Sequence, residues 1–353
     1  MKQPHPYKSQ PDKAFWSRAV AENYSASDLV ESLYPIFRAN DIVASAGSCF
    51  ASNIVKPIEA VGFRYMRTEE LPSPLNQLPE NLGYRNFSAA YGNIYTARQF
   101  RQLLERADGR FRPAENYWLM SGDYVDPFRP GLRYPANSLG EHNAIQAQHL
   151  ESTKYAFTNA DVTVFTLGLT EAWESIEDGS VYPTCPGTVS GVFDDQKYRF
   201  INFSVHEVVD DMVRAFSIIK SWRSEARFVL TVSPVPLVAT ATNEHVVTAT
   251  ILSKSILRVA ASEVCREMSD VKYFPAYEIV TGPQDARNLF EENRRDVTQD
   301  AIDIVMKSLI SNCEIPKNIN KANQQKVLSE VAMRSSISRD LMNAECDEVV
   351  LEW

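Results

Sequence analysis

A short apolar segment that ends in a glycine and a serine constrains the fold of this chain more than any other feature. Residues 42–46 read Ile-Val-Ala-Ser-Ala, and Gly47 and Ser48 follow them. From Phe50 to Val61, apolar residues then recur at spacings of three and four, the period of a helix. The pattern predicts a strand, a tight turn and a helix. It places the Ser48 hydroxyl at the carboxyl edge of a sheet, where ligands of open α/β sheets bind.

Further strand and helix patterns alternate along the chain. Apolar runs rich in β-branched and aromatic residues, typical of buried strands, occupy residues 162–167, 227–232 and 271–274. Helical spacing is found at residues 49–61, 97–107, 141–158, 205–222, 244–267 and 299–311. Strands that alternate with helices predict a three-layer α/β/α fold with a mainly parallel sheet and right-handed crossovers.

Three long connections interrupt this alternation, at residues 66–96, 108–140 and 175–203. Prolines, glycines and tyrosines recur in them, without a helical or strand period. Long loops in a compact domain are usually functional. We therefore expect these loops to cover the carboxyl edge of the sheet and to shape a pocket there.

The sequence divides into three parts. Residues 1–40 are polar and aromatic, and we expect an N-terminal lead-in that packs on the main domain. Residues 41–312 contain the strand and helix patterns and should form one catalytic domain. Residues 313–353 begin polar, show helical spacing from Val327 onward and end acidic. We expect a C-terminal helical tail, which fits either a peripheral helix or a partner-binding segment.

Charge and composition exclude several classes of protein. The chain carries 36 Lys and Arg against 45 Asp and Glu, and its net charge of −9 argues against a nucleic-acid binder. No apolar stretch is long enough to span a bilayer, and residues 1–8 lack the apolar region of a secretory signal. The five cysteines have no zinc spacing, and His142 and His149 share a helix face without acidic partners. We expect reduced thiols, a cytoplasmic location, no metal site and no cofactor.

Two interpretations of Ser48 remain open from the residues alone. Free N–H groups in the first turn of the following helix could hold an oxyanion, which makes Ser48 a candidate nucleophile. Serine is also a favoured N-cap residue, so Ser48 could serve only to begin the helix. The next residue, Cys49, is a third possibility, because helix N-termini activate thiols; buried packing is its alternative.

Several motifs resemble those of one family. Residues 47–51, Gly-Ser-Cys-Phe-Ala, resemble the signature for which the GSCFA family is named, a branch similar to the SGNH (GDSL-like) hydrolases. Six further segments of the chain resemble segments of that family and occur in the same order. They are residues 91–99, 126–130, 166–173, 233–237, 253–255 and 273–278. The resemblance spans residues 40–310. It implies an SGNH-like fold and serine-dependent acyl-ester chemistry on a small-molecule or carbohydrate ester, by an O-acetyl esterase or a polysaccharide O-acyltransferase.

The resemblance assigns the nucleophile and the oxyanion donors. Ser48 is the nucleophile, with its own backbone N–H as one donor. SGNH enzymes add a glycine N–H and an asparagine side chain, and Gly92 and Asn93 fit these roles. A Gly-Asn dipeptide is also frequent in turns, so a purely structural role stays open.

A second motif departs from the SGNH pattern. The Gly-x-Asn-Asp motif is replaced by residues 168–171, Gly-Leu-Thr-Glu, which puts Thr170 at the asparagine position. A threonine hydroxyl can still donate one hydrogen bond to an oxyanion. Glu171 could orient a base or bind a sugar hydroxyl; its alternative is a carboxylate in the first turn of a helix.

The chain departs most from the SGNH pattern at the general base. Residues 294–299 stand where SGNH enzymes have Asp-x-x-His, and they contain no histidine. His245 is the best substitute, since it follows the strand at 227–232, and Asp296 or Glu278 could orient it. A histidine at a helix start is the structural alternative.

Two basic residues have both functional and structural interpretations. Lys254 could be the base of a Ser–Lys arrangement, although a surface helix charge is the favoured interpretation. Arg129 could clamp a phosphate or carboxylate of the substrate, or it could pair with Asp126 to anchor a loop.

The missing Asp-x-x-His motivates a second hypothesis for the whole protein. The same fold could bind a glycan or a nucleotide sugar without catalysis. Binding that is unchanged by Ser48→Ala would support that hypothesis.

Overall fold

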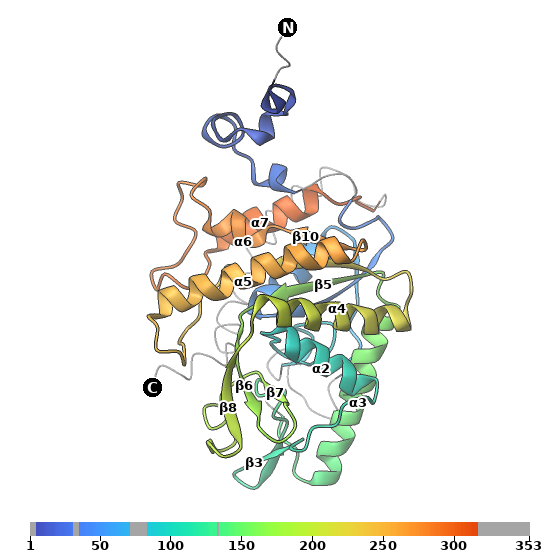
Figure 1. Ribbon diagram of the computed structural model, residues 1–353. Coiled ribbons are helices and arrows are strands. Elements are labelled where there is room, and N and C mark those ends of the chain that lie inside the picture. The colour runs from blue at the N-terminus through green and yellow to red at the C-terminus, as the bar shows by residue number, and fades with distance from the viewer. Residues whose placement is uncertain (1–4, 31–34, 71–82, 133, 317–353) are drawn as a thin grey trace.

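The computed structural model describes residues 5–30, 35–70, 83–132 and 134–316 (Figure 1). A parallel sheet lies at its centre, with its strands in the order β10-β9-β5-β1-β2. These strands are β1 (Ile42–Gly47), β2 (Arg64–Tyr65), β5 (Val162–Leu167), β9 (Arg227–Val232) and β10 (Val271–Phe274). The four strands expected from the sequence are confirmed, and the first of them extends to Gly47.

Helices cover both faces of this sheet, which confirms the three-layer α/β/α architecture (Figure 1). One face packs against α2 (Ala97–Ala107), α3 (Leu139–Asn159), α4 (Val205–Trp222) and α5 (Val246–Glu267). The other face packs against the 3-10 helix η5 (Cys49–Ile54) and against α1 (Val55–Ala60), α6 (Ala276–Thr281) and α7 (Gln299–Ser311). Burial from both sides explains why β5 is apolar at nearly every position.

Aromatic stacking joins the first helical layer to the sheet. The ring of Phe100 in α2 lies 4.3 Å from that of Phe165 in β5. In the same way, Phe216 in α4 lies 4.0 Å from Phe228 in β9. Such ring pairs add to the stabilisation from burial alone, so they fix the helices at defined places on the sheet.

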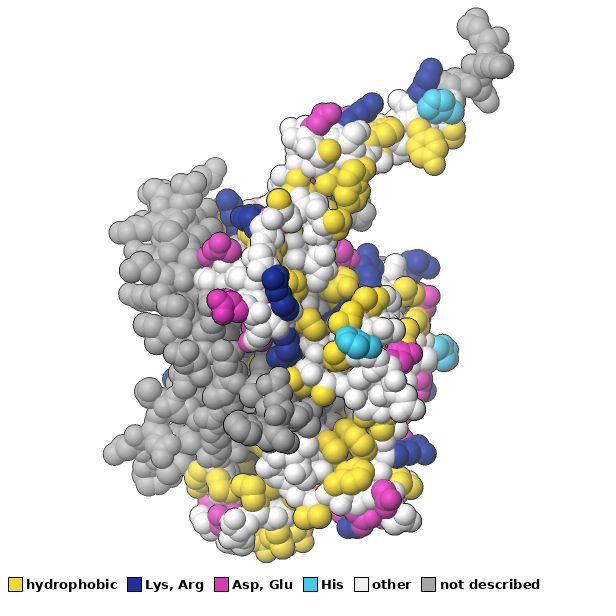
Figure 2. Space-filling model, turned by 90° about the vertical axis from the view of Figure 1, so that its left-hand side faces the viewer, with side chains coloured by type: hydrophobic (Ala, Val, Ile, Leu, Met, Phe, Trp, Pro, Cys, Tyr) yellow, Lys and Arg dark blue, Asp and Glu magenta, His cyan; other side chains and the backbone are white. Residues whose placement is uncertain are grey.

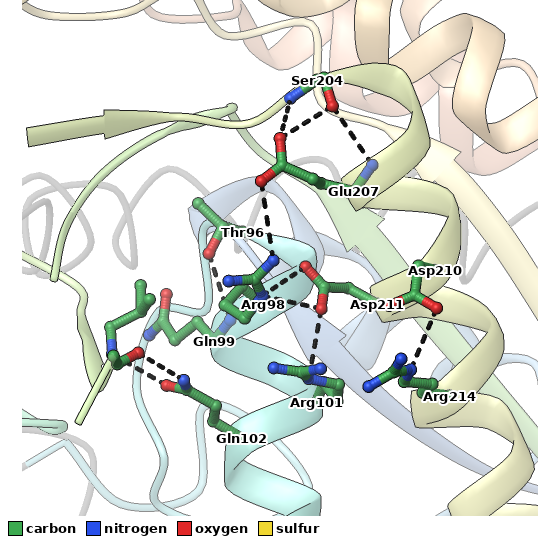
Figure 3. Close-up of polar contacts among 12 residues, drawn as sticks. Thr96, Arg98, Gln99, Arg101, Gln102, Ser204, Glu207, Asp210, Asp211 and Arg214 are labelled. Carbon is green, nitrogen blue, oxygen red and sulfur yellow. Dashed lines mark hydrogen bonds and ion pairs between the residues drawn. The ribbon is translucent and has the colours of Figure 1, made fainter.

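The helices α2 and α4 are also held together by a buried carboxylate (Figure 3). Asp211 of α4 is fully buried, and its oxygens lie 2.8 Å from Arg98 Nε and 3.2 Å from Arg101 Nε. Two arginines on one face of α2 therefore meet one carboxylate of α4. The contact fixes the start of α2, and residues 91–96 lead into that start.

A second, smaller sheet begins just before residues 175–203, which the sequence presents as a loop, and continues into them. It is antiparallel, in the order β7-β6-β8, with β6 (Glu171–Ser175), β7 (Val181–Tyr182) and β8 (Tyr198–Asn202). A hairpin of β3 (Trp118–Met120) and β4 (Asp123–Val125) lies in the preceding connection. These strands have two to five residues, too short to show an alternating period. The prediction of one helix at 49–61 is also corrected, since a 3-10 helix precedes a short α-helix there.

The N-terminal region has two parts. The 3-10 helix η4 (Ala26–Leu29) packs on α7, where Ser308 Oγ donates a 2.9 Å hydrogen bond to the Ala26 carbonyl. Residues 5–22 extend away from the body, with hydrophobic side chains on their surface (Figures 1 and 2). The tail predicted after residue 316 lies outside the described residues. In the part of the chain that the structure describes, no helix has the length and apolar character needed to cross a membrane.

Candidate active site

Ser48 lies at the carboxyl edge of the sheet, directly after β1. It occupies the N-cap position of η5, yet its side chain makes no capping hydrogen bond. Its hydroxyl is buried and has no hydrogen-bond partner, and the residue is only 3% exposed. Capping therefore does not explain this serine. Buried polar atoms without a partner are rare, so the hydroxyl needs another explanation.

Two glycines create the space around Ser48. Gly47 has a φ of +139°, and a Cβ there would lie 2.5 Å from the Thr166 carbonyl oxygen of β5. Gly168 directly follows β5, and a Cβ on it would lie 3.0 Å from the Ser48 Cβ. Side chains at either position would force the strands apart. Glycine at both positions thus lets the ends of β1 and β5 meet at the serine.

The segment that contains Gly92 and Asn93 runs along the same edge. Ile94 N–H donates a 2.8 Å hydrogen bond to the Gly47 carbonyl, and the Tyr95 carbonyl accepts one of 3.1 Å from Gly168 N–H. Gly92 has a φ of +65°, and no other described part of the protein lies within 4 Å of the place where its Cβ would be. The predicted oxyanion segment is therefore beside Ser48.

The backbone N–H groups near Ser48 are not equally free to bind an oxyanion. The Ser48 N–H itself, an expected oxyanion donor, donates to the Thr166 carbonyl at 3.3 Å. The N–H groups of Cys49 and Phe50 come next, in the first turn of η5. First-turn N–H groups have no carbonyl partner within their helix. They are therefore better placed than the Ser48 N–H to receive an oxyanion.

Thr170 does not have the predicted arrangement. Its hydroxyl donates a 2.6 Å hydrogen bond to Asn202 Oδ1, and its N–H donates to Ser253 Oγ at 3.0 Å. A hydroxyl has a single proton, and Asn202 already receives it. In this arrangement Thr170 joins β5 to the smaller sheet and gives no hydrogen bond to an oxyanion.

Glu171 begins β6, so its interpretation as a first-turn helix charge is wrong. Its carboxylate accepts hydrogen bonds from Thr240 Oγ1 at 2.8 Å and from Ala241 N–H at 3.3 Å. Burial raises its pKa, against the lowering effect of the Thr240 and Ala241 hydrogen bonds. Glu171 thus fixes the connection between β9 and α5, which ends at His245.

His245 is an exposed residue at the N-cap of α5. Its Nδ1 accepts a 3.2 Å hydrogen bond from Val247 N–H, so the ring caps the helix. A triad histidine has the opposite arrangement, with an N–H at Nδ1 that points to a carboxylate. The structure gives His245 the capping role that the sequence left as an alternative.

The two carboxylates expected to orient His245 are bound elsewhere. Glu278 accepts from Arg258 Nε at 2.5 Å and from the Tyr273 hydroxyl at 2.7 Å. Arg258 follows His245 by thirteen residues in α5, a rise of about 20 Å along the axis. Asp296 accepts a 2.8 Å hydrogen bond from Asn293 Nδ2. Neither carboxylate forms a pair with His245 in this arrangement.

Lys254 is the site residue whose interpretation changes most. It is 2% exposed, so its favoured interpretation as a surface helix charge is wrong. Its Nζ donates a 2.6 Å hydrogen bond to the carbonyl oxygen of Gly168, the residue that packs against Ser48. The signal was in the sequence, because Lys254 stands three residues before the buried Leu257 and seven before Ala261.

Arg129 is buried within the protein and is held by two carboxylates. Its Nε lies 2.8 Å from Asp126 Oδ2, and its Nη1 lies 3.1 Å from Glu69 Oε1. The loop-anchoring alternative describes this geometry, and the pairing with Glu69 was not expected. Burial alone would raise the pKa of Glu69, but His149 and Arg129 outweigh it and lower the pKa to about 2.

No group of three or more potential metal ligands lies among the described residues. The site is built from a serine hydroxyl, backbone N–H groups, glycines and a buried amine. These are the components of acyl transfer by a serine nucleophile.

Two of the distant matches among solved structures illustrate what this chain is similar to. One is a protein described provisionally as a platelet activating factor from Streptococcus pneumonia, with 10% identity, a TM-score of 0.36 and coverage of 81% of this chain and 88% of that one. The other is a carbohydrate esterase family 2 enzyme with a carbohydrate binding domain from Corynascus thermopiles (Myceliophthora fergusii). It has 13% identity, a TM-score of 0.29 and coverage of 79% and 67%.

No match was found among curated proteins. The GSCFA family profile matches residues 42–309, which include the whole central sheet and the segments that surround Ser48. The chain therefore belongs to the GSCFA family.

Proposed function

We propose that this protein performs serine-dependent acyl-ester chemistry, with Ser48 as the nucleophile. The observation that carries the proposal is the buried Ser48 hydroxyl, which neither caps its helix nor has a hydrogen-bond partner. It stands where β1, β5 and the first turn of η5 meet. A substrate carbonyl at this point would meet both the hydroxyl and free backbone donors.

The reaction proceeds in two steps. Ser48 Oγ attacks the ester carbonyl carbon while a base takes its proton, and the tetrahedral oxyanion is held by N–H groups of η5 and Gly92. The C–O bond to the leaving alcohol then breaks, and the alcohol receives the proton. Water or the hydroxyl of a second molecule removes the acyl group from Ser48.

Lys254 is the proposed base. Its position supports this role, because its Nζ reaches the Gly168 carbonyl and Gly168 packs against Ser48. The Ser48 hydroxyl has no hydrogen-bond partner, so Nζ must turn from the Gly168 carbonyl toward it when substrate binds. Burial disfavours an ammonium ion, and buried lysines accept protons in Ser–Lys arrangements. His245 is the second candidate, and it requires that the connection between β9 and α5 move toward Ser48 and release the helix cap.

The proposed substrate class is an O-acylated carbohydrate, which rests on the sequence resemblance to SGNH enzymes. A hydrolase and an O-acyltransferase differ only in what attacks the acyl-enzyme. An acylated sugar donor should therefore be incubated with and without a sugar acceptor, and the products identified. Appearance of the acylated acceptor sugar supports transfer. Release of free acid alone, even when the acceptor is present, refutes it. A cytoplasmic location is proposed with this function, since Cys185, Cys265 and Cys313 are free thiols.

Labelling with a fluorophosphonate, read by peptide mass spectrometry, tests the nucleophile and the base together. The samples are the unmodified protein, Ser48→Ala, Lys254→Met and His245→Ala. We expect an adduct on Ser48 that is lost in Lys254→Met and kept in His245→Ala. The reverse pattern would make His245 the base. No adduct on the unmodified protein would contradict the proposal and favour a non-catalytic glycan-binding protein.

A further inference from the structure

A buried arginine outside the candidate active site has no counter-charge in contact with it. Arg106 of α2 is 6% exposed, and its guanidinium lies 4.1 Å from the centre of the Phe128 ring. Its Nη2 is buried without a hydrogen-bond partner, and no carboxylate among the described residues lies within ion-pair distance. Burial lowers the pKa of Arg106 to about 10. An arginine stays charged at physiological pH, so its location is costly unless something else binds it.

His149 of α3 presents a second buried atom without a partner. Its Nδ1 lies 2.7 Å from Glu69 Oε2, and the residue is 1% exposed. The carboxylate can only accept, so the proton of this contact is on Nδ1. The other ring nitrogen, Nε2, is buried and has no hydrogen-bond partner.

Arg106 and His149 line the same small cavity. Its volume is about 20 Å³, and its other lining residues are Tyr91, Ile94, Gln99, Gln102, Leu103, Phe128, Arg129 and Val181. The side-chain amides of Gln99 and Gln102 are already bound to backbone groups. About 10–15 Å³ is needed for one water, so this cavity holds one water or one monatomic ion and no larger group.

We propose that this cavity binds one halide-sized anion, chloride under ordinary conditions, between Arg106 Nη2 and His149 Nε2. Arg106 and Arg129 carry two positive charges, and Glu69 and Asp126 carry two negative charges. The cluster is therefore neutral when His149 is neutral. The charge of an added anion is balanced if His149 takes up a proton. Both ring nitrogens then donate hydrogen bonds, Nδ1 to Glu69 and Nε2 to the anion. A neutral His149 presents a lone pair at Nε2, which repels an anion and accepts from a water.

Anion binding is thus coupled to proton uptake. The groups that face His149 are Glu69, Arg129 and Asp126 from loops, Arg106 from α2 and the ring of Tyr91. Burial and Arg129 lower the pKa of His149, while Glu69 and Asp126 act in the opposite direction. A bound anion favours the imidazolium, so affinity rises as the pH falls.

The cavity is connected to the segment beside Ser48. Glu69 Oε2 accepts from Ala90 N–H at 2.7 Å, and Arg129 Nη1 donates to the Ala90 carbonyl at 3.5 Å. Ala90 stands two residues before Gly92. An anion that orders Arg106 and His149 therefore stabilises the segment that contains Gly92, whatever reaction Ser48 performs.

Bromide replaces chloride and has an anomalous X-ray signal, which makes it the probe. Crystals of the full chain are soaked in bromide at about pH 4.5 and at about pH 8. The lower value lies well below the ordinary histidine pKa, because burial and Arg129 lower the pKa of His149. We expect an anomalous peak between Arg106 Nη2 and His149 Nε2 at the lower pH. Absence of the peak at both pH values, or a water in its place at both, would overturn the proposal.

Thermal unfolding gives an independent measurement. Sodium bromide and sodium gluconate are compared at equal ionic strength for the unmodified protein, Arg106→Met and the exposed control Arg110→Met. We expect bromide to raise the Tm by about 2 °C or more at the lower pH, except in Arg106→Met. If Arg106→Met fails to fold, the His149→Gln variant is measured in its place. The glutamine side chain can still donate a hydrogen bond to Glu69 but cannot become cationic, so the bromide effect should vanish in this variant. A bromide effect that is equal in all foldable variants would refute the site.

Discussion

Lys254 Nζ donates a 2.6 Å hydrogen bond to the carbonyl oxygen of Gly168, whose backbone packs against Ser48. A helix on one face of the sheet thus places a buried amine at the strand end that adjoins the candidate nucleophile. Lys254 is therefore either the base that takes the Ser48 proton or a structural residue that holds the end of β5, and a substitution can distinguish the two roles. That substitution gives the first prediction.

Replacing Lys254 with methionine should abolish activity and lower stability. The apolar side chain keeps the volume but removes the proton acceptor, so ester turnover should fall by about 10²-fold or more. The Gly168 carbonyl would lose a buried hydrogen bond, at a cost of about 1–3 kcal/mol in the free energy of unfolding. Turnover of an activated ester and urea unfolding measure the two effects.

Ser255→Ala is the control, because the neighbouring Ser255 is exposed on the same helix. It should leave both quantities unchanged. A Lys254→Met protein that unfolds more easily but retains full turnover would make Lys254 a structural residue only.

Gly47→Ala should destabilise the protein strongly. The φ of +139° and the 2.5 Å approach to Thr166 O leave no room for a methyl group between β1 and β5. We expect a loss of about 3 kcal/mol or more in the free energy of unfolding, together with loss of fluorophosphonate labelling at Ser48. Gly109→Ala separates backbone strain from crowding, since Gly109 also has a positive φ, of +74°, but open space around it. It should cost only about 1–2 kcal/mol, and equal losses in the two variants would contradict the crowding argument.

Glu69 should contribute to stability in a defined range of pH. Its folded-state pKa is about 2, below the ordinary value of 4.5, so its contribution is full above 4.5 and is lost as the pH falls toward 2. Glu69→Gln should therefore flatten the dependence of unfolding free energy on pH in this range. Near neutral pH it should cost about 3–5 kcal/mol, because Arg129 loses one buried partner.

Glu70→Gln is the matched control, one residue further along the chain. Glu70 pairs with Arg85 on the surface, where its side chain is 73% exposed. Surface pairs contribute about 0–1 kcal/mol, so this variant should keep the pH dependence of the unmodified protein. A steep acid dependence that survives in Glu69→Gln would assign the effect to another carboxylate.

The fold was predictable where burial imposes a period, whereas only part of the site was predictable. The segments that became β5, β9, α2, α4 and α7 were each predicted with the residues that the structure shows. The two strands are buried on both faces, and each helix is buried along one face. Many residues in each segment therefore repeat the same pattern of apolar side chains. The strands of the smaller sheet are short, and pairing with distant residues stabilises them rather than local preference.

The site residues depend on single contacts that leave no period in the sequence. Ser48 and Gly92 were identified through a motif, and the structure brings their segments together. Thr170 was expected to point at the oxyanion, but its partner Asn202 comes from β8, a strand that the sequence did not predict. His245 was chosen because imidazole is the usual base, whereas the helix start that it occupies gives it a capping role.

Thr170→Val decides whether the Thr170 hydroxyl acts in catalysis or in folding. Valine keeps the shape and removes the hydroxyl, so Asn202 Oδ1 loses its 2.6 Å hydrogen bond. We expect a loss of about 1–3 kcal/mol in the free energy of unfolding and an unchanged kcat, because the hydroxyl proton is directed at Asn202 and away from the reacting carbonyl. Steady-state kinetics on an activated ester, below the unfolding temperature of the variant, measure kcat and KM separately. Removal of a true oxyanion donor costs about 10²–10³-fold in kcat. A fall of that size without a change in stability would return Thr170 to the oxyanion hole, and it would mean that its hydroxyl turns from Asn202 toward Ser48 when substrate binds.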